Sequence, residues 1–451
     1  MKQLLKPSTR MLWWLVILAA FAVLVGILQA LGRGPTVRLD SLFWALICAI
    51  GALALLDAFW LWRLPSPRVQ RHLSGSLALG RWSEVRIDLE HNFRRSVSLT
   101  LFDHGPQGLG NHCEVEYLPQ QMTLRPHRKA QLTYRLRPTS RGHFIFQRIE
   151  IQLRSPLRLW LSRRYLPVAN SARVYPDFAR LHNGQLLAVD NWLSQIGVRQ
   201  RQRRGPGLEL NQLREFREGD SLRQIDWKAT ARQRIPIARE YQDERDQQIV
   251  FLLDCGWRMR SQDGELTHFD HALNACLLLG YVALRQGDAV GVSTFAAEHD
   301  RHLAPVKGVA QLNVLLNHVY DLNSTRRPAD YSAAIRQVLI RQKRRALVVL
   351  VTNLRDEDDE DLLGAVKQLS RHHRVLVASL REEVLDALRQ TPVRTWQQAL
   401  DYCGTVAFLN ARAALHERLS AHGIPVLDVR PAELGPQLVS RYLSWKKAGT
   451  L

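Results

Sequence analysis

Two long apolar runs near the start of the chain limit its possible folds more than any other feature. The first extends from Met11 to Leu31, with Gln29 as its only clearly polar member. The second extends from Leu42 to Trp62 and contains one charge, Asp57. About 20 apolar residues cross the hydrocarbon core of a bilayer as a helix. Because a short link with glycine and proline joins the runs, we predict that residues 1–66 form a transmembrane hairpin, with spans at about 11–31 and 42–62.

The single carboxylate of the second run has two interpretations. A charge inside a membrane is costly, so intramembrane carboxylates are often functional. Asp57 also stands near the end of its run, where the side chain can reach interfacial water. We favour the second interpretation.

Basic residues are more frequent on the flanks of the hairpin than in its loop. The flanks carry Lys2, Lys6, Arg10, Arg63, Arg68 and Arg71, whereas the loop carries Arg33 and Arg38. Since membrane proteins keep Lys and Arg on the cytoplasmic side, we predict that both flanks and the bulk of the chain are cytoplasmic. The five cysteines are scattered and form no C-x-x-C pair, which agrees with a reducing compartment.

The whole chain is strongly basic. Its formal net charge is +20, from 62 Lys+Arg against 42 Asp+Glu. Such a charge fits nucleic acid, anionic lipid or an acidic protein as a partner. The basic cluster from Arg199 to Arg204 has no aromatic residues between its arginines on which bases could stack. We therefore do not expect a nucleic-acid partner.

Residues 67–176 alternate apolar and polar side chains with a period of two. Val85, Ile87 and Leu89 alternate with charged residues, and similar alternation recurs further along this segment. Period two, interrupted by turns with Gly, Pro and Asn, predicts antiparallel strands that each have one buried face. We predict an antiparallel β-sandwich.

Strand and helix patterns alternate over residues 247–451. Ile249 to Leu253 is an unbroken apolar strand, typical of a sheet that is covered on both faces. Thr267 and Asp270 form a capping box at the start of the helix that follows. Further strands are expected near 290–295, 346–351, 375–380 and 424–429. This alternation predicts a doubly wound, mostly parallel α/β sheet.

The polar segment between these regions, residues 177–246, contains a distinctive charged run. It reads Arg214-Glu215-Phe216-Arg217-Glu218-Gly219-Asp220 and continues through Ile225-Asp226-Trp227-Lys228 to Arg232, ahead of the strand that ends in Asp254. The run resembles the signature of a bacterial family known as domain of unknown function fifty-eight. Arg141-Gly142-His143-Phe144 and Val174-Tyr175-Pro176 are also similar to that family. The resemblance covers most of the chain after the hairpin.

The resemblance implies more than the residues alone do. It implies a von Willebrand factor A-like fold for residues 247–451 and a location in the bacterial inner membrane. Proteins of this type are often encoded beside MoxR-type AAA+ ATPases, with which they are supposed to act in the assembly or maturation of other proteins. What it implies is therefore a membrane-anchored adaptor that binds a protein partner.

The metal site that is usual in that fold is not expected in this chain. It takes Asp-x-Ser-x-Ser, a Thr and a second Asp, whose hard oxygens suit magnesium or manganese. The matching positions of this sequence are Asp254, Gly256, Arg258, Ala329 and Asn353. Since only the first keeps its ligand, we predict no metal and no other cofactor. An ion pair between Arg258 and Asp254 is our hypothesis for what replaces the metal.

The signature residues themselves have two interpretations. The candidates are Arg214, Gly219, Asp220, Arg223, Asp226, Trp227 and Arg232. In the first interpretation the aspartates cap turns or pair with the arginines, while the tryptophan packs against the sheet. In the second they form a docking surface. We favour a role in the fold combined with a partly exposed docking face.

Sequence motifs of the common enzyme classes are missing. The chain has no phosphate-binding G-x-x-x-x-G-K-[ST], no dinucleotide-binding G-x-G-x-x-G after a strand and no G-x-S-x-G. We therefore expect a non-enzymatic protein. The alternatives are a structural scaffold of a cell-envelope complex and an enzyme whose site has no recognisable motif.

Overall fold

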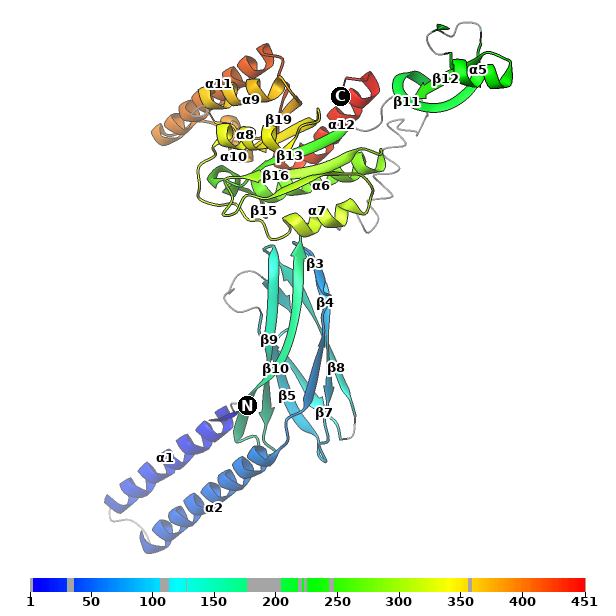
Figure 1. Ribbon diagram of the computed structural model, residues 1–451. Coiled ribbons are helices and arrows are strands. Elements are labelled where there is room, and N and C mark those ends of the chain that lie inside the picture. The colour runs from blue at the N-terminus through cyan, green and yellow to red at the C-terminus, as the bar shows by residue number, and fades with distance from the viewer. Residues whose placement is uncertain are drawn as a thin grey trace. The chain divides into compact units, whose positions relative to one another are not determined.

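The computed structural model describes residues 3–30, 36–105, 113–126, 128–176, 204–217, 221–222, 225–242, 247–355 and 359–450. The chain divides into two compact units, Met1–Tyr175 and Pro176–Leu451 (Figure 1).

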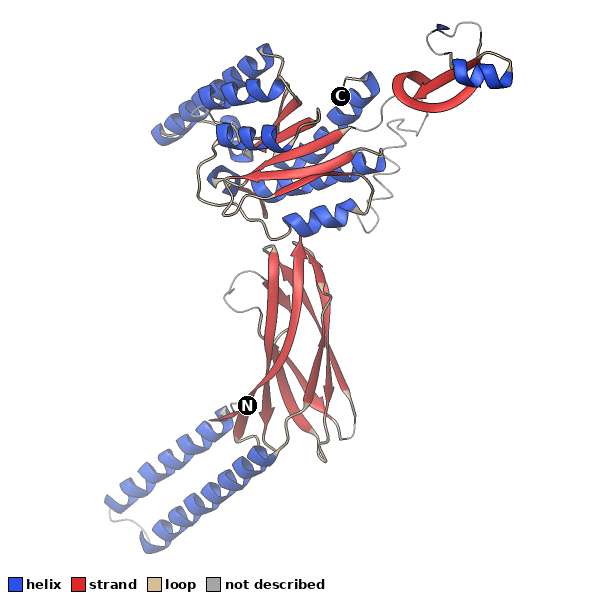
Figure 2. Cartoon of the chain, in the orientation of Figure 1, coloured by secondary structure: helices blue, strands red, loops and turns tan. Residues whose placement is uncertain are grey.

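Two long helices near the start of the first unit lie side by side (Figures 1 and 2). They are α1 (Thr9–Ala30) and α2 (Thr36–Arg63). Both are long and apolar enough to cross a membrane, over Thr9–Ile27 and Ser41–Arg63. Many of their apolar side chains are exposed, such as Leu55 with 72% of its surface, so these helices are not the core of a soluble domain. The predicted pair of long apolar helices is confirmed.

Two β-sheets make up the rest of the first unit. One has the order β1-β10-β9-β5-β7 with β3 beside β10, and the other has the order β2-β4-β8-β6. The strands are β1 (Gln3–Pro7), β2 (Arg68–His72), β3 (Ser76–Ala78), β4 (Ser83–Glu90), β5 (Val97–Asp103), β6 (Cys113–Glu116), β7 (Gln120–Leu124), β8 (Ala130–Pro138), β9 (Gly142–Arg154) and β10 (Trp160–Tyr175). Along β4 and β5 alternate side chains are buried, since each sheet turns one face to the core. These sheets fit the predicted antiparallel sandwich.

The first sheet begins before the first helix. Strand β1 pairs antiparallel with the start of β10, with Gln3 opposite Arg164 and Pro7 opposite Trp160. From the sequence we assign these residues to the hairpin, because a strand of this length is too short to display a period of two. The outer ends of α1 and α2 therefore both continue into strands of the sandwich, β1 and β2.

Asp57 is buried, although it lies in a membrane-type helix. Its carboxylate accepts hydrogen bonds from the backbone N–H groups of Leu157 and Leu159, at 3.1 and 3.3 Å. Our interpretation that this side chain reaches interfacial water is wrong, because a turn of the sandwich covers it.

A buried ion pair joins the two sheets. Arg71 of β2 donates from Nε to Asp103 of β5 at 2.8 Å, and Tyr134 of β8 donates from its hydroxyl to the same carboxylate at 2.6 Å. The Arg71 guanidinium also donates to the carbonyl of Val168 at 3.0 Å. The pKa of Tyr134 is raised mainly by burial and, to a smaller extent, by the charge of Asp103, so the hydroxyl remains a donor. Arg71 is thus unavailable to the membrane surface, although it belongs to the basic flank of the hairpin.

Breaking this pair from one side should destabilise the first unit. We expect Asp103→Ala to lower its free energy of unfolding by about 3–5 kcal/mol, because the Arg71 charge would stay buried without its partner. Scanning calorimetry of the purified chain in detergent measures this change. The control is Glu114→Ala, which removes an ion pair with Arg137 from a half-exposed carboxylate and should cost at most about 1 kcal/mol. Equal effects of the two substitutions would contradict the role of the buried pair.

The second unit contains a six-stranded sheet of the order β17-β16-β13-β18-β19-β20. Its strands are β13 (Gln248–Asp254), β16 (Ala289–Phe295), β17 (His302–Val306), β18 (Leu347–Thr352), β19 (Arg374–Leu380) and β20 (Val426–Val429). All neighbours are parallel except β17, which runs antiparallel at one edge. The predicted doubly wound α/β sheet is present, and its central strands are buried on both faces.

Helices cover both faces of this sheet (Figure 2). Residues of α6 (His268–Arg285), α7 (Gln311–Val319) and α12 (Leu434–Ala448) share one hydrophobic core. Residues of α8 (Tyr331–Arg341), α9 (Asp359–Ser370) and α11 (Trp396–Ala421) share the other. The capping box of Thr267 and Asp270 is confirmed at the start of α6. The sequence patterns did not predict α12, the edge strand β17 or the short helix α10 (Glu383–Gln390).

Candidate functional site

The carboxyl end of the parallel sheet is the first place where an α/β fold of this kind holds a ligand. Asp254 ends β13 there and is fully buried. One carboxylate oxygen accepts from the Gly256 N–H and the other from the Thr352 hydroxyl, both at 2.7 Å. Burial raises the pKa of Asp254, while the two hydrogen bonds and the charge of Arg258 act in the opposite direction. Both oxygens are therefore engaged by neighbouring residues.

Gly256 leaves no room for a side chain at this end of the sheet. A Cβ atom there would lie 2.9 Å from the Asp254 carboxylate and 2.9 Å from the carbonyl oxygen of Arg327. The Trp257 N–H donates to that same carbonyl at 3.1 Å, which fixes the close approach of the two loops. A serine ligand at position 256 would therefore collide with the backbone.

Positive charge lies beside Asp254. Arg258 belongs to a short 3₁₀ helix, Trp257–Arg260, and is buried. Its guanidinium carbon lies 5.5 Å from the centre of the Trp257 ring, and that of Arg355 lies 4.8 Å from the same ring. The charge of Arg258 acts against the rise in the pKa of Asp254. The ion pair between these two residues stays a hypothesis.

Asn353 is held by a residue that no sequence pattern indicated. Its amide oxygen accepts from Arg412 at 3.1 Å, and its amide nitrogen donates to Glu382 at 2.6 Å. Arg412 comes from α11 and is 1% exposed. The same guanidinium donates to the carbonyl of Leu380 at 2.7 Å and pairs with Asp428 at 2.6 Å. No sequence signal marks this arginine, because its partners lie on three different strand ends.

A divalent cation does not fit these residues. Ala329 offers no oxygen from its side chain and packs against the core of α8 and α9. Asn353 and the Asp254 carboxylate are committed to protein donors. Among the described residues no group of three or more His, Cys, Asp or Glu side chains is arranged to hold a metal ion. The arrangement can hold the strand ends together, but it lacks the oxygen set of a metal centre.

A test of this packing compares two glycines. We expect Gly256→Ala to destabilise the second unit by about 1–3 kcal/mol, since the added methyl group meets backbone and a buried carboxylate. Gly364→Ala, in α9, places its methyl group where no other atom lies within 4 Å, and it should be neutral or stabilising by up to about 1 kcal/mol. Calorimetric unfolding of both variants measures the difference. A Gly256→Ala variant as stable as Gly364→Ala would show that this loop has room for a ligand side chain.

The charged signature run forms a small module in the second unit. Strands β11 (Arg204–Glu215) and β12 (Ile237–Gln242) pair antiparallel, and helix α5 (Trp227–Gln233) lies between them in the chain. Asp226 caps α5 by accepting from the N–H groups of Lys228 and Ala229, both at 3.0 Å. The Ala229 N–H and then the Arg239 guanidinium, 2.9 Å away, hold the pKa of Asp226 below its usual value.

The cap also joins α5 to the neighbouring strand. The Asp226 N–H donates to the Ile237 carbonyl at 2.8 Å, and the Ile237 N–H donates to the Thr230 hydroxyl at 2.9 Å. Asp226 therefore caps a helix, as one interpretation expected, but its charged partner is Arg239 and not the expected Arg214 or Arg232. Arg239 lies outside the signature run, so the pattern of the run could not indicate it.

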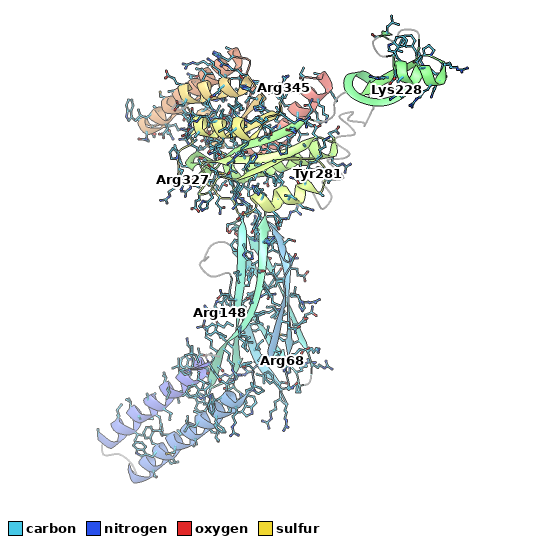
Figure 3. The ribbon with its side chains drawn as sticks, viewed as in Figure 1. Arg68, Arg148, Lys228, Tyr281, Arg327 and Arg345 are labelled. Carbon is cyan, nitrogen blue, oxygen red and sulfur yellow. The ribbon has the colours of Figure 1, made fainter. Side chains whose placement is uncertain are left out.

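Trp227 does not pack against a sheet. It is 71% exposed, and α5 contains no buried residue at all. Arg232 and Lys228, the latter labelled in Figure 3, are exposed on the same helix. Arg214 lies on β11 and donates to the Glu215 carbonyl at 3.0 Å. The expectation that Trp227 is buried is wrong, because a helix this short and this polar has no apolar face to bury.

The predicted roles of three signature candidates are not tested by the structure. Gly219, Asp220 and Arg223 lie outside the described residues. Exposed apolar side chains near the helix are described, namely Leu222 and Ile235. We call the set of Leu222, Trp227, Lys228, Arg232, Arg234 and Ile235 the α5 surface.

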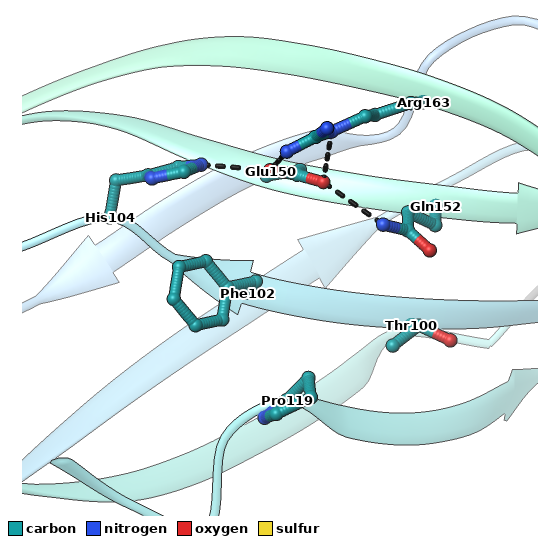
Figure 4. Close-up of a pocket in the computed structure, with 7 residues that line it drawn as sticks. All are labelled: Thr100, Phe102, His104, Pro119, Glu150, Gln152 and Arg163. Carbon is teal, nitrogen blue, oxygen red and sulfur yellow. Dashed lines mark hydrogen bonds and ion pairs between the residues drawn. The ribbon is translucent and has the colours of Figure 1, made fainter.

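A shallow pocket lies on the first sheet of the first unit (Figure 4). Glu150, which lines it, accepts hydrogen bonds from Arg163 at 2.6 Å, from Gln152 at 3.0 Å and from His104 at 2.9 Å. Burial favours the neutral acid, but these hydrogen bonds prevail and lower the pKa of Glu150 to about 2. A carboxylate with such a pKa stays ionised near neutral pH, so it is a poor general acid or base.

Comparison with known proteins links part of the chain to a family. Residues 212–395 match the model of a family described as "Protein of unknown function DUF58", which supports membership of that family. No curated protein matches the sequence. The CARDB domain of the PF1109 protein in complex with di-metal ions, from Pyrococcus furiosus, is a similar solved structure at 12% identity. It covers 25% of this chain and 90% of its own, with a TM-score of 0.16, which is too low to carry an argument.

Proposed function

We propose, starting from the family match over residues 212–395, that this chain is a membrane-anchored, non-enzymatic adaptor for a protein partner. The two apolar helices supply the anchor in the inner membrane of a bacterium. The basic flanks of the hairpin favour a cytoplasmic location for both units. The partner that the family resemblance favours is a MoxR-type AAA+ ATPase engaged in the assembly or maturation of other proteins.

The observation that carries this proposal is the exposure of Trp227 within the family-matched segment. Tryptophan is costly to leave in water, and it is enriched among the residues that dominate binding energy in protein interfaces. Lys228 and Arg232 are exposed on the same helix. Apolar anchors among positive charges fit a partner with an apolar groove bordered by carboxylates.

The α/β sheet supports a von Willebrand factor A-like fold for the second unit. Its five parallel strands with one antiparallel edge strand, β17, agree with that assignment. Since the carboxyl end of the sheet lacks the oxygen ligands of a metal centre, partner binding is independent of divalent metal at that end. The docking face of the adaptor is then the α5 surface.

A pair of tryptophan variants tests the docking face. Trp227 and Trp396 both occupy the first position of a helix, follow a side-chain cap and are exposed, by 71% and 79%. Trp396 lies just beyond the family-matched segment, so it is a matched control. After crosslinking in cells and purification in mild detergent, Trp227→Ala should reduce recovery of the ATPase at least about tenfold, as for an interface hot spot. Trp396→Ala should leave the recovery unchanged.

Two other outcomes decide against parts of the proposal. Equal recovery with both variants would remove the α5 surface as the docking face. Recovery of envelope proteins without any ATPase would favour the alternative function, a structural scaffold of a cell-envelope complex.

A further inference from the structure

The turn between β9 and β10 is bonded to both apolar helices. It spans residues 155–159 and is closed by the Ser155 N–H, which donates to the Trp160 carbonyl at 3.1 Å, and by the Trp160 N–H, which donates to the Ser155 hydroxyl at 3.0 Å. The same turn provides the two N–H groups that bind Asp57. Whether the turn reaches the membrane depends on how far along the axis of each helix these contacts lie.

Contacts with α2 lie well before the end of that helix. The turn meets Asp57 through Leu157 and Leu159, and the Trp160 indole donates to the Ala54 carbonyl at 2.9 Å. At 1.5 Å per residue, Asp57 and Ala54 stand about 9 and 14 Å before the helix end at Arg63. This part of α2 belongs to the apolar stretch Ser41–Arg63.

On the side of α1 the contacts are made by Ser8, the residue just before that helix. The Ser8 N–H donates to the Leu159 carbonyl at 2.8 Å, and the Ser8 hydroxyl donates to the Arg158 carbonyl at 2.5 Å. The turn is therefore level with the start of α1 and with Asp57 of α2. From these levels the apolar stretches run for about 29 Å in α1, to Ile27, and for about 26 Å in α2, back to Ser41, which is close to the hydrocarbon thickness of about 30 Å.

The tip of the turn carries an exposed apolar side chain at this level. Leu157 is 50% exposed although its backbone is fixed, and Arg158 beside it is exposed as well. Phe59 and Trp62, on the last turns of α2, are exposed on the sandwich side of Asp57, where aromatic side chains prefer the headgroup layer. Half of the Leu157 surface is therefore still available for burial in hydrocarbon at this depth.

We propose that the β9–β10 turn is a third membrane contact of this chain, besides the two helices. Leu157 enters the outer edge of the hydrocarbon, and Arg158 lies at the phosphates of the lipid headgroups. The ligand of this surface is a phospholipid bilayer. The inference rests on the proposed membrane anchor, and it adds that the sandwich touches the membrane through its own turn.

Spin labels at three positions test this contact on the full chain. The background replaces Cys48, Cys113 and Cys403 with serine and keeps the buried Cys255 and Cys276. Single cysteines are then introduced as Leu157→Cys, as Leu55→Cys within α2 and as Ser76→Cys on β3. Ser76 is exposed and lies opposite Arg173 of β10, about 40 Å along that strand from Trp160.

The labelled protein is reconstituted in vesicles of phosphatidylethanolamine and phosphatidylglycerol. Power-saturation resonance spectra compare access to oxygen, which concentrates in hydrocarbon, with access to a water-soluble nickel chelate. We expect the labels at 157 and 55 to favour oxygen and the label at 76 to favour nickel. Leu157 bonds to Asp57 through its backbone N–H, so Leu157→Cys should not disturb folding. The adjacent residue Pro156 is exposed, and Pro156→Cys provides a second reporter.

The labels within α2 distinguish a failure of the third membrane contact from a failure of the membrane anchor. If the label at 55 favours oxygen while those at 157 and 156 favour nickel, the third contact is overturned and the anchor stands. Because Leu55 lies about 3 Å from the level of Asp57, a label introduced as Leu46→Cys reports on the middle of the span. If the labels at 55 and 46 both favour nickel, the anchor itself fails, and the inference fails with it.

Discussion

The carboxyl end of the parallel sheet is closed by its own side chains, and this constraint limits what that end of the second unit can bind. Asp254 uses both oxygens on Gly256 and Thr352, and a guanidinium lies beside it. Arg412 bridges the ends of β18, β19 and β20 from inside the fold. A buried arginine is tolerated only when carbonyls and carboxylates surround it, so these groups are not free to receive a ligand.

An exposed face elsewhere is therefore the better candidate for binding. The module of β11, α5 and β12 depends on a small number of polar contacts, with Asp226 joining the helix cap to Arg239 and to the strand. These contacts fix α5 and leave Trp227 in solvent. Of the signature candidates that the structure describes, Asp226 shapes the local fold, while Trp227 and Arg232 are exposed.

The first unit joins its two parts through hydrogen bonds of strand β10 and of the turn before it. Strand β10 pairs with β1 ahead of α1, and the turn at its start binds α2 through Asp57. Arg164 of the same strand donates to the carbonyls of Leu61 and Leu64 at 2.8 and 2.7 Å, which satisfies the end of α2. The orientation of the sandwich on the helices is consequently set by one strand.

Much of the fold could be predicted from the sequence, and the failures have a common cause. Apolar length identified α1 and α2, period two identified β4 and β5, and a capping box identified the start of α6. These are local patterns. The roles of Arg412, Arg239 and Asp57 depend on partners far along the chain or outside the signature run, so no local pattern marks them. Strand β1 was missed because five residues carry too little pattern.

The most direct measurement compares the two candidate binding faces in living cells. A photo-reactive amino acid replaces Trp227 in one variant and Trp257, at the carboxyl end of the sheet, in another. The account predicts a crosslinked adduct with an AAA+ ATPase from position 227 and none from position 257. An adduct from position 257 alone would contradict it, because the partner would then bind at the end of the sheet that these side chains close.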